Sequence, residues 1–165
     1  MARSRDRVRL PLILAALLLF AACEEGPGSE ADDDPPEAPA SEPLSDDPLE
    51  AAIQKTARKR TRYMQPEGDF RRGSLEQGET MDLALVLKDP HCYAAFAQGG
   101  PDVEDLDLFL YDPANVPVQQ DSATNPHPTL GLSDPVCPAE PGVYRLQVKV
   151  HRGHGEFALR LYRSE

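Results

Sequence analysis

Apolar and polar residues alternate with a period of two over most of the chain after residue 73. The alternating runs lie at 80–87, 92–97, 105–111, 116–118, 130–132, 144–151 and 157–162. This period is typical of β-strands that bury one face and expose the other. Segments rich in Gly, Pro, Asn and Asp separate the runs and indicate turns. The pattern predicts an all-β, antiparallel sandwich of seven or eight strands, in which the polar half of each strand faces water.

A helical period precedes the strands, between residues 48 and 63. Asp47 suits the N-cap position, and Pro48 suits the first position of a helix. Apolar residues then recur at helical spacing, at Leu49, Ile53 and Ala57. We expect one short helix over 48–63, followed by a connection that reaches residue 66. Because the apolar stripe is narrow, we expect this helix to pack weakly.

Basic residues gather in the second half of this helix. They are Lys55, Arg58, Lys59, Arg60 and Arg62. Cations near the C-terminal end of a helix are favoured by the helix dipole. We expect a solvated basic face that balances acidic residues elsewhere, and contact with phospholipid head groups is the alternative.

The segment 24–47 is acidic and rich in proline. It holds ten acidic residues, no basic residue and five Pro. Such a segment cannot bury enough apolar surface to offset the entropy lost on ordering. We expect residues 23–47 to form a disordered tether, and a tail that binds cations or a partner is the alternative.

The chain starts with a basic segment and an apolar run. Arg3, Arg5, Arg7 and Arg9 precede an apolar stretch that ends at Ala22. The stretch has about 13 residues, whereas a helix that spans a bilayer needs roughly 20. The pattern therefore predicts a signal peptide over 1–22.

Residues 20–23 read Phe-Ala-Ala-Cys. This resembles the lipobox of bacterial lipoproteins, in which the peptide is cut before the Cys and the Cys is acylated. Phe20 departs from that pattern, since Leu is usual at this position. The resemblance implies that Cys23 carries a lipid anchor in a membrane of the bacterial cell envelope. In enterobacterial lipoproteins, an Asp directly after the acylated Cys favours retention in the inner membrane. Glu24 stands at this position here, so the resemblance implies sorting to the outer membrane.

Charge narrows the classes of partner. The whole chain has a net charge of −11, and from Cys23 onward 13 basic and 27 acidic side chains give −14. This balance argues against a nucleic-acid partner, which attracts basic surfaces. It also argues against charge-driven docking on anionic lipid, so we expect membrane attachment through acyl chains.

Assigning Cys23 to the lipid leaves two cysteines, Cys92 and Cys137. An even pair in an oxidising compartment predicts a disulfide. Two buried free thiols are the alternative.

Residues 67–165 carry several motifs in a fixed order. They include Gly-Ser-Leu-Glu-Gln-Gly-Glu-Thr at 73–80, Asp-Leu-Asp-Leu-Phe-Leu-Tyr-Asp-Pro at 105–113 and Pro-Gly-Val-Tyr-Arg-Leu-Gln-Val at 141–148. This order is similar to the bacterial pre-peptidase C-terminal (PPC) domain, which is a jelly-roll-like sandwich. That domain follows the catalytic domains of secreted proteases and also occurs alone on lipoproteins. The resemblance implies a jelly-roll-like fold and, as an alternative function, an accessory or chaperone role for a secreted peptidase.

Asp105, Asp107 and Asp121 are the candidate metal ligands. Asp105 and Asp107 are two residues apart, so on a strand they project from the face opposite Leu106 and Leu108. Calcium prefers six to eight oxygen ligands, and some PPC relatives bind it through acidic residues. The alternative is that these carboxylates cap turns by accepting backbone N–H groups.

Phe109 and Tyr111 fall on the polar face of their strand and are candidates for an exposed binding surface. Cover by a neighbouring loop or by the helix is the alternative. The sequence has no G-x-S-x-G elbow and no phosphate-binding loop, so we do not expect an enzyme. We expect a lipid-anchored, non-catalytic module for binding or scaffolding, with a protein or polysaccharide ligand. A calcium-stabilised adhesion or polymer-binding module is the first alternative, and a hydrolase ranks lower.

Overall fold

The computed structural model describes residues 42–165. The predicted signal peptide, the predicted acylation site Cys23 and most of the predicted tether over 23–47 lie outside the described residues.

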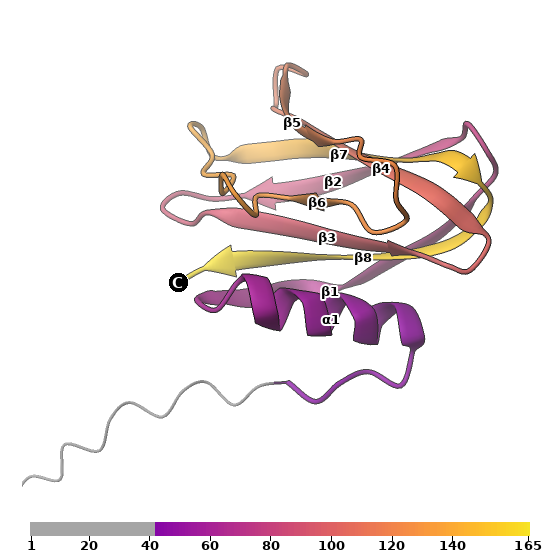
Figure 1. The fold of residues 1–165 in the computed structure, drawn as a ribbon. Coiled ribbons are helices and arrows are strands. Elements are labelled where there is room, and N and C mark those ends of the chain that lie inside the picture. The colour runs from indigo at the N-terminus through magenta and orange to yellow at the C-terminus, as the bar shows by residue number, and fades with distance from the viewer. Residues whose placement is uncertain (1–41) are drawn as a thin grey trace, which may run out of the picture. The chain divides into compact units, whose positions relative to one another are not determined.

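One helix and eight strands follow one another along the described chain (Figure 1). They are α1 (Pro48–Arg60), β1 (Met64–Leu75), β2 (Thr80–Leu87), β3 (Tyr93–Gly99), β4 (Val103–Tyr111), β5 (Pro117–Asp121), β6 (Thr129–Leu130), β7 (Gly142–Gly153) and β8 (Gly155–Ser164). The strands form two four-stranded sheets, with the orders β1-β8-β3-β6 and β2-β7-β4-β5. Each pair of neighbouring strands is antiparallel. This order is that of a jelly roll, and the predicted antiparallel sandwich of seven or eight strands is confirmed.

The main core lies between the two sheets. Leu106 and Leu108 of β4 and Leu146 and Val148 of β7 are fully buried there, and Phe157 of β8 meets them from the other sheet. Burying a side chain of this size contributes roughly 1.5–3 kcal/mol. Since these residues stand at every second position, the predicted period of two marks the core face correctly.

The first strand was not predicted as a strand. β1 begins at Met64, before the predicted start of the sandwich at 67 and well before the alternation starts at 73. Its sequence contains Pro66 and Gly68, and its pairing with β8 shifts register between Glu67 and Arg71. Gly68 has a φ of 71°, which favours glycine. An irregular edge strand of this kind shows no clean alternation.

Helix α1 packs on the outer face of the sheet β1-β8-β3-β6 (Figure 1). Ile53 and Ala57 contact a second buried cluster that includes Phe96 of β3 and Tyr162 of β8. The rings of Phe96 and Tyr162 meet edge to face, with centroids 5.4 Å apart. β3 and β8 are therefore buried on both faces, and the prediction that their second face meets water is wrong. The helix ends at Arg60, three residues before the predicted end.

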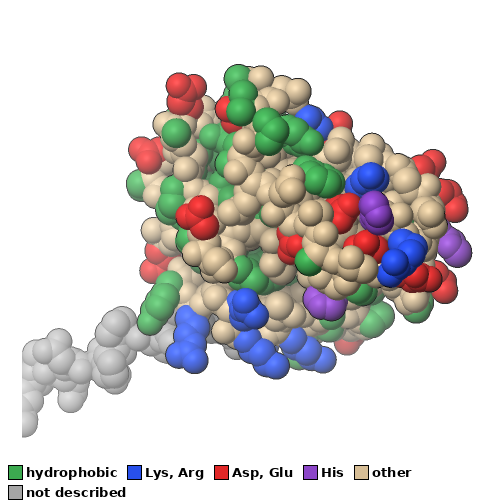
Figure 2. Space-filling view, turned by 45° about the horizontal axis from the view of Figure 1, so that its top comes forward, with side chains coloured by type: hydrophobic (Ala, Val, Ile, Leu, Met, Phe, Trp, Pro, Cys, Tyr) green, Lys and Arg blue, Asp and Glu red, His purple; other side chains and the backbone are tan. Residues whose placement is uncertain are grey.

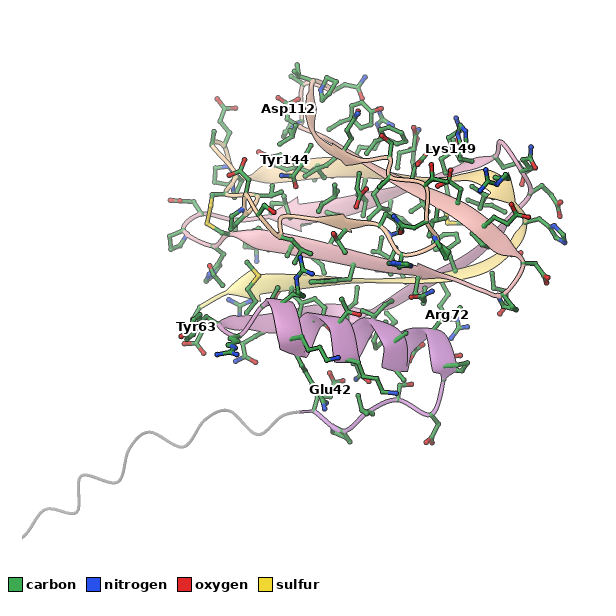
Figure 3. The ribbon with its side chains drawn as sticks, viewed as in Figure 1. Glu42, Tyr63, Arg72, Asp112, Tyr144 and Lys149 are labelled. Carbon is green, nitrogen blue, oxygen red and sulfur yellow. A yellow bond between two sulfur atoms is a disulfide. The ribbon has the colours of Figure 1, made fainter. Side chains whose placement is uncertain are left out.

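The start of α1 is fixed by Asp47. The Asp47 carboxylate accepts hydrogen bonds from the backbone N–H groups of Leu49 and Glu50, as an N-cap does. Arg72 of β1 lies near this end of the helix (Figure 3) and forms ion pairs with Asp47 at 2.7 Å and Glu50 at 3.1 Å. The hydrogen bond from Arg72 lowers the pKa of Asp47, and the N–H groups of the first helical turn lower it further. The predicted N-cap is confirmed.

The residues just before α1 also have fixed contacts. The side chain of Arg160 on β8 is only 9% exposed and pairs with Glu42 at 2.6 Å. Its guanidinium also lies over the ring of Phe70, 4.5 Å from the centroid. Gln54 of α1 accepts from the N–H of Ser45 and donates to the carbonyl of Pro43. Residues 42–47, predicted as the end of the tether, thus pack against the domain.

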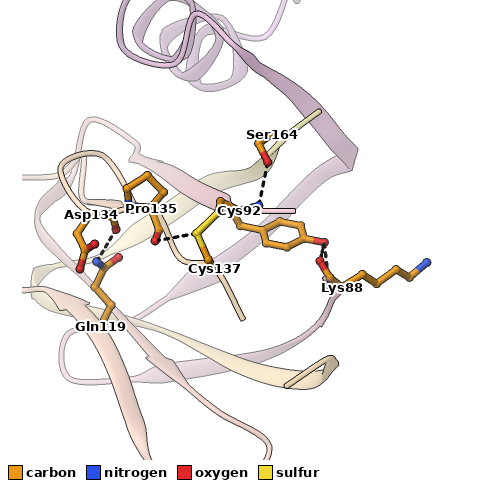
Figure 4. The surroundings of a disulfide bond; sticks show 8 residues. Lys88, Cys92, Gln119, Asp134, Pro135, Cys137 and Ser164 are labelled. Atoms are coloured by element: carbon orange, nitrogen blue, oxygen red, sulfur yellow. Dashed lines mark hydrogen bonds between the residues drawn. A yellow bond between two sulfur atoms is a disulfide. The ribbon is translucent and has the colours of Figure 1, made fainter. Parts of the chain in front are cut away.

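A disulfide joins Cys92 and Cys137, which are 45 residues apart in sequence (Figure 4). Tyr93 and Val136 beside it exchange two backbone hydrogen bonds, and Cys92 N–H donates to the hydroxyl of Ser164. The bond ties the connection between β6 and β7 to the start of β3. The predicted pairing is confirmed, and closing a loop of this length stabilises the fold by about 4 kcal/mol in the chain-entropy account.

We predict that Ile53→Ala lowers the free energy of unfolding by about 2–4 kcal/mol, because Ile53 is 2% exposed and its loss leaves a cavity between α1 and the sheet. Urea unfolding measures the change. Lys55→Ala, at an exposed position of the same helix, is the control and should cost less than about 0.5 kcal/mol. Equal small effects of the two substitutions would show that α1 packs weakly.

Candidate functional site

The outer face of the sheet β2-β7-β4-β5 points away from α1 and is accessible to solvent. We call it the open face; it comprises Asp82, Ala84, Val86, Phe109, Tyr111, Gln120, Val143, Arg145 and Gln147. Except for Gln120 on β5, these residues alternate along their strands with residues that face the core. The open face is therefore the polar half of the sequence pattern, interrupted by two aromatic rings.

The sheet register places the two rings beside polar side chains. Phe109 lies between Gln147 of β7 and Gln120 of β5, and Asp82 of β2 follows beyond Gln147 in the same row. In the next row Tyr111 pairs with Arg145, and Arg145 pairs with Ala84. Cross-strand neighbours of this kind stand about 4.5–5.5 Å apart, so each ring is next to hydrogen-bonding groups.

Arg145 organises the middle of the open face. Its guanidinium lies over the ring of Tyr111, 3.8 Å from the centroid, as in a cation–π contact. It also pairs with Asp82 at 3.1 Å and donates two hydrogen bonds to Oδ1 of Asn115. Gln147 donates to the same Asp82 oxygen at 3.0 Å. These contacts hold the polar groups of the face in fixed positions.

Valine side chains are exposed at one end of the open face. Val86 and Val143 pair across β2 and β7, and they are 57% and 58% exposed. Val116 and Val118 are also exposed, beside and on β5. The face thus offers apolar contact at its end and aromatic and hydrogen-bonding groups at its centre.

Phe109 and Tyr111 are partly exposed, and neither α1 nor a loop buries them. Both side chains thus stand on the outward face of β4, and their role as a binding surface stays a prediction. Sequence reasoning did not include Arg145 in the site. The alternation in 144–151 places Arg145 on the outward face, but only the register of β4 against β7 brings it over Tyr111.

Asp105 and Asp107 are each only 4% exposed, so the expectation of an exposed pair on this strand is wrong. The pairing of β4 with β7 is irregular on both sides of Asp105. Beyond the end of β5, the chain continues beside β4, where Leu106 N–H donates to the carbonyl of Asn125. The bulges of β4 and the segment that ends at Asn125 lie against Asp105, whose carboxylate the outer face of a regular strand would leave in water.

Two of the three predicted metal ligands bind backbone instead. Asp121 accepts from the N–H groups of Ala123 and Thr129, one with each oxygen, and Asp105 accepts from the N–H of Asn125 at 3.2 Å. This is the turn-capping alternative. Within residues 42–165, no group of three or more His, Cys, Asp or Glu side chains is arranged to hold a metal ion. The predicted calcium set of Asp105, Asp107 and Asp121 is therefore not formed.

Asp107 has no such cap. Nδ1 of His151 lies 3.7 Å from its Oδ2, which is beyond hydrogen-bond distance. Burial raises the pKa of Asp107, and the negative charge of Asp105 raises it further. His151 and Lys149 act in the opposite direction. The ionised form of Asp107 is thus less favourable in the folded state than in water, and this lowers the stability of the fold at neutral pH.

No family model matches this chain, and no curated protein is similar to it at a significant level.

We predict that Asp107→Asn raises the free energy of unfolding at pH 7 by about 1 kcal/mol, because it removes the charge of a side chain that is mostly buried and accepts no hydrogen bond from residues 42–165. A folded-state pKa above the unfolded value means that wild-type stability falls as the pH rises through the folded pKa. The advantage of the variant should therefore vanish below about pH 4, where Asp107 is protonated in both states.

Thermal unfolding at several pH values measures this difference. Asp69→Asn removes an exposed carboxylate from β1 and serves as the control, with no expected gain at any pH. A gain from Asp107→Asn that persists undiminished at low pH would mean that charge is not its source.

Proposed function

We propose that this protein is an acyl-anchored, non-catalytic binding module of the bacterial cell envelope, and that the open face binds an extended envelope polysaccharide. The fold then serves as a rigid support, and the ligand lies across β4 and β7.

The central row of the open face is the observation that carries this proposal. Phe109 presents ring surface to which the C–H faces of a sugar can pack, and Tyr111 adds a partly exposed ring with Arg145 over one of its faces. Gln120, Gln147 and Asp82 beside them provide amide and carboxylate groups for hydroxyl groups. Because these groups lie on a sheet, they repeat at strand spacing and suit a chain-like ligand.

The location rests on the N-terminal sequence. The basic start, the short apolar run and Cys23 resemble a lipoprotein signal, and acylation of Cys23 provides the anchor. Among residues 42–165, no helix is long and apolar enough to cross a bilayer. The motif order that resembles a PPC domain also supports an accessory module, since that domain occurs alone on lipoproteins.

We predict that Phe109→Ala and Tyr111→Ala each weaken binding to purified peptidoglycan sacculi by roughly ten-fold, because each loses one ring contact. Gln147→Ala should weaken it as well while leaving both rings in place. Cosedimentation with the sacculi measures binding. Tyr63→Ala is the matched control, since Tyr63 is 85% exposed and lies outside the open face.

Thermal melting of each variant shows whether it is folded. Binding that the three open-face variants retain at the wild-type level would exclude the open face as the polysaccharide site. If the wild type bound a protein and not sacculi, and the Phe109→Ala and Tyr111→Ala variants lost that binding, the open face would be assigned to a protein ligand.

We predict that Cys23→Ser releases the protein from cell membranes after a high-salt wash, whereas the wild type stays in the membrane fraction. Acyl chains hold a protein through burial of CH₂ groups, which salt does not weaken. Immunoblots of washed membranes measure the distribution. A Cys23→Ser protein that resists the wash would show that another element anchors it.

A further inference from the structure

Helix α1 turns a basic surface directly away from the sheet that it covers. Lys55, Arg58 and Lys59 are exposed and stand on the side of the helix opposite Ile53 and Ala57, which are buried. Arg60 and Arg62 are exposed at the end of the helix. We call these five cations the basic face. Its position is fixed, because the buried side of α1 allows only one orientation of the helix.

The cations of the basic face differ from most others in the described part of the chain. Arg72, Arg145, Arg152, Arg160 and Arg163 each pair with a carboxylate. Within residues 42–165, the cations of the basic face form no ion pair, and Arg58 donates only to the carbonyl of Glu42. Figure 2 shows Lys and Arg side chains along the lower edge of the molecule, without acidic side chains between them. Their charge is available to an outside partner.

An exposed aromatic residue adjoins this charge. Tyr63 follows Arg62 and is 85% exposed, beyond the C-terminal end of α1 (Figure 3). A tyrosine has an apolar ring and a polar hydroxyl, and it is enriched where protein meets the head-group region of a membrane. The cations and this ring together suit a lipid membrane, which has anionic head groups at its surface and apolar acyl chains beneath them.

The described chain begins beside the basic face. Glu42 contacts both Arg58 of α1 and Arg160 of β8. Only 18 residues separate Cys23 from Glu42, and a chain of this length spans at most about 60 Å. An anchored chain therefore keeps Glu42, beside α1, within about 60 Å of the membrane that holds its acyl groups.

We infer that the basic face docks on the anionic head groups of the membrane that carries the anchor. The inference rests on the proposed attachment through Cys23, and it assigns an orientation to the domain. With α1 against the lipid, the open face lies on the far side of both sheets, toward the polysaccharide.

The net charge of the protein does not prevent this contact. At physiological ionic strength charges are screened over about 8 Å. The acidic side chains on the far side of the two sheets are therefore screened from a membrane at α1. The seven acidic side chains of residues 24–41 are nearer to the basic face along the chain, and their charge opposes that of its five cations. The inference departs from the expectation, drawn from net charge, that argued against charge-driven docking on anionic lipid.

Vesicle binding by the full mature chain, residues 23–165 with Cys23→Ser, tests the inference. We expect it to bind vesicles that contain equal parts of phosphatidylglycerol and phosphatidylcholine, and not vesicles of phosphatidylcholine alone. Added salt should weaken binding. K55Q/K59Q/R62Q should weaken it on the order of 100-fold, since each cation near an anionic surface contributes about five-fold.

R71Q/K88Q/K149Q is the matched control. It removes two lysines and one arginine from exposed or half-exposed positions outside α1, so it changes the net charge equally. We expect this control to bind like its parent, and circular dichroism verifies the fold of both variants. Equal loss in the two triple variants, or binding that ignores phosphatidylglycerol, would overturn the inference.

This experiment is independent of the anchor. All vesicle samples carry Cys23→Ser, so vesicle binding does not depend on acylation. A finding that Cys23 is never acylated in cells would therefore contradict only the proposed function. Conversely, the wild type can prove to be acylated in cells while the Cys23→Ser form fails to bind anionic vesicles. That result would contradict only the proposed orientation and would leave the proposed anchor intact.

Discussion

The sheet β1-β8-β3-β6 carries apolar side chains on both of its faces, and the rest of the structure depends on covering both. One face packs on the second sheet through residues such as Phe157. The other presents Phe96 and Tyr162, which are 1% and 5% exposed because α1 packs over them together with Met64, Phe70 and Leu132. Without the helix these rings would meet water, at a cost of about 25 cal/mol for each Å² of apolar surface. Residues 42–165 therefore form a three-layer structure of helix, sheet and sheet.

This arrangement assigns different roles to the two outer surfaces. Because α1 covers one sheet, only the other sheet has an open face, and Tyr111 and Arg145 lie there. Because α1 buries its apolar side, its cations point outward. A basic surface and an aromatic, hydrogen-bonding surface thus stand at opposite ends of the layered structure (Figure 1). A module held between a lipid surface and a polymer needs such a division.

The candidate site was partly predictable. The alternation in 105–111 placed Phe109 and Tyr111 on the outward side of β4, where the structure has them. The same rule failed for Asp105 and Asp107, which it also assigned to solvent. Facing outward is not the same as being exposed, since both carboxylates are buried and a segment from beyond β5, ending at Asn125, lies against Asp105. Local periodicity contains no information about such a cover.

The sequence by itself determined the strands with clean alternation and the N-cap at Asp47, because these depend on neighbouring residues. It also determined the pairing of Cys92 with Cys137, because these two cysteines are left once Cys23 is assigned to the lipid. Only the tertiary structure decided that β1 is a strand, since its pairing with β8 makes up for an irregular sequence. It also decided that a helix with a narrow apolar stripe is a structural layer. The reason is the same in both cases: burial depends on what lies on the other side of a residue, and that partner comes from a distant part of the chain.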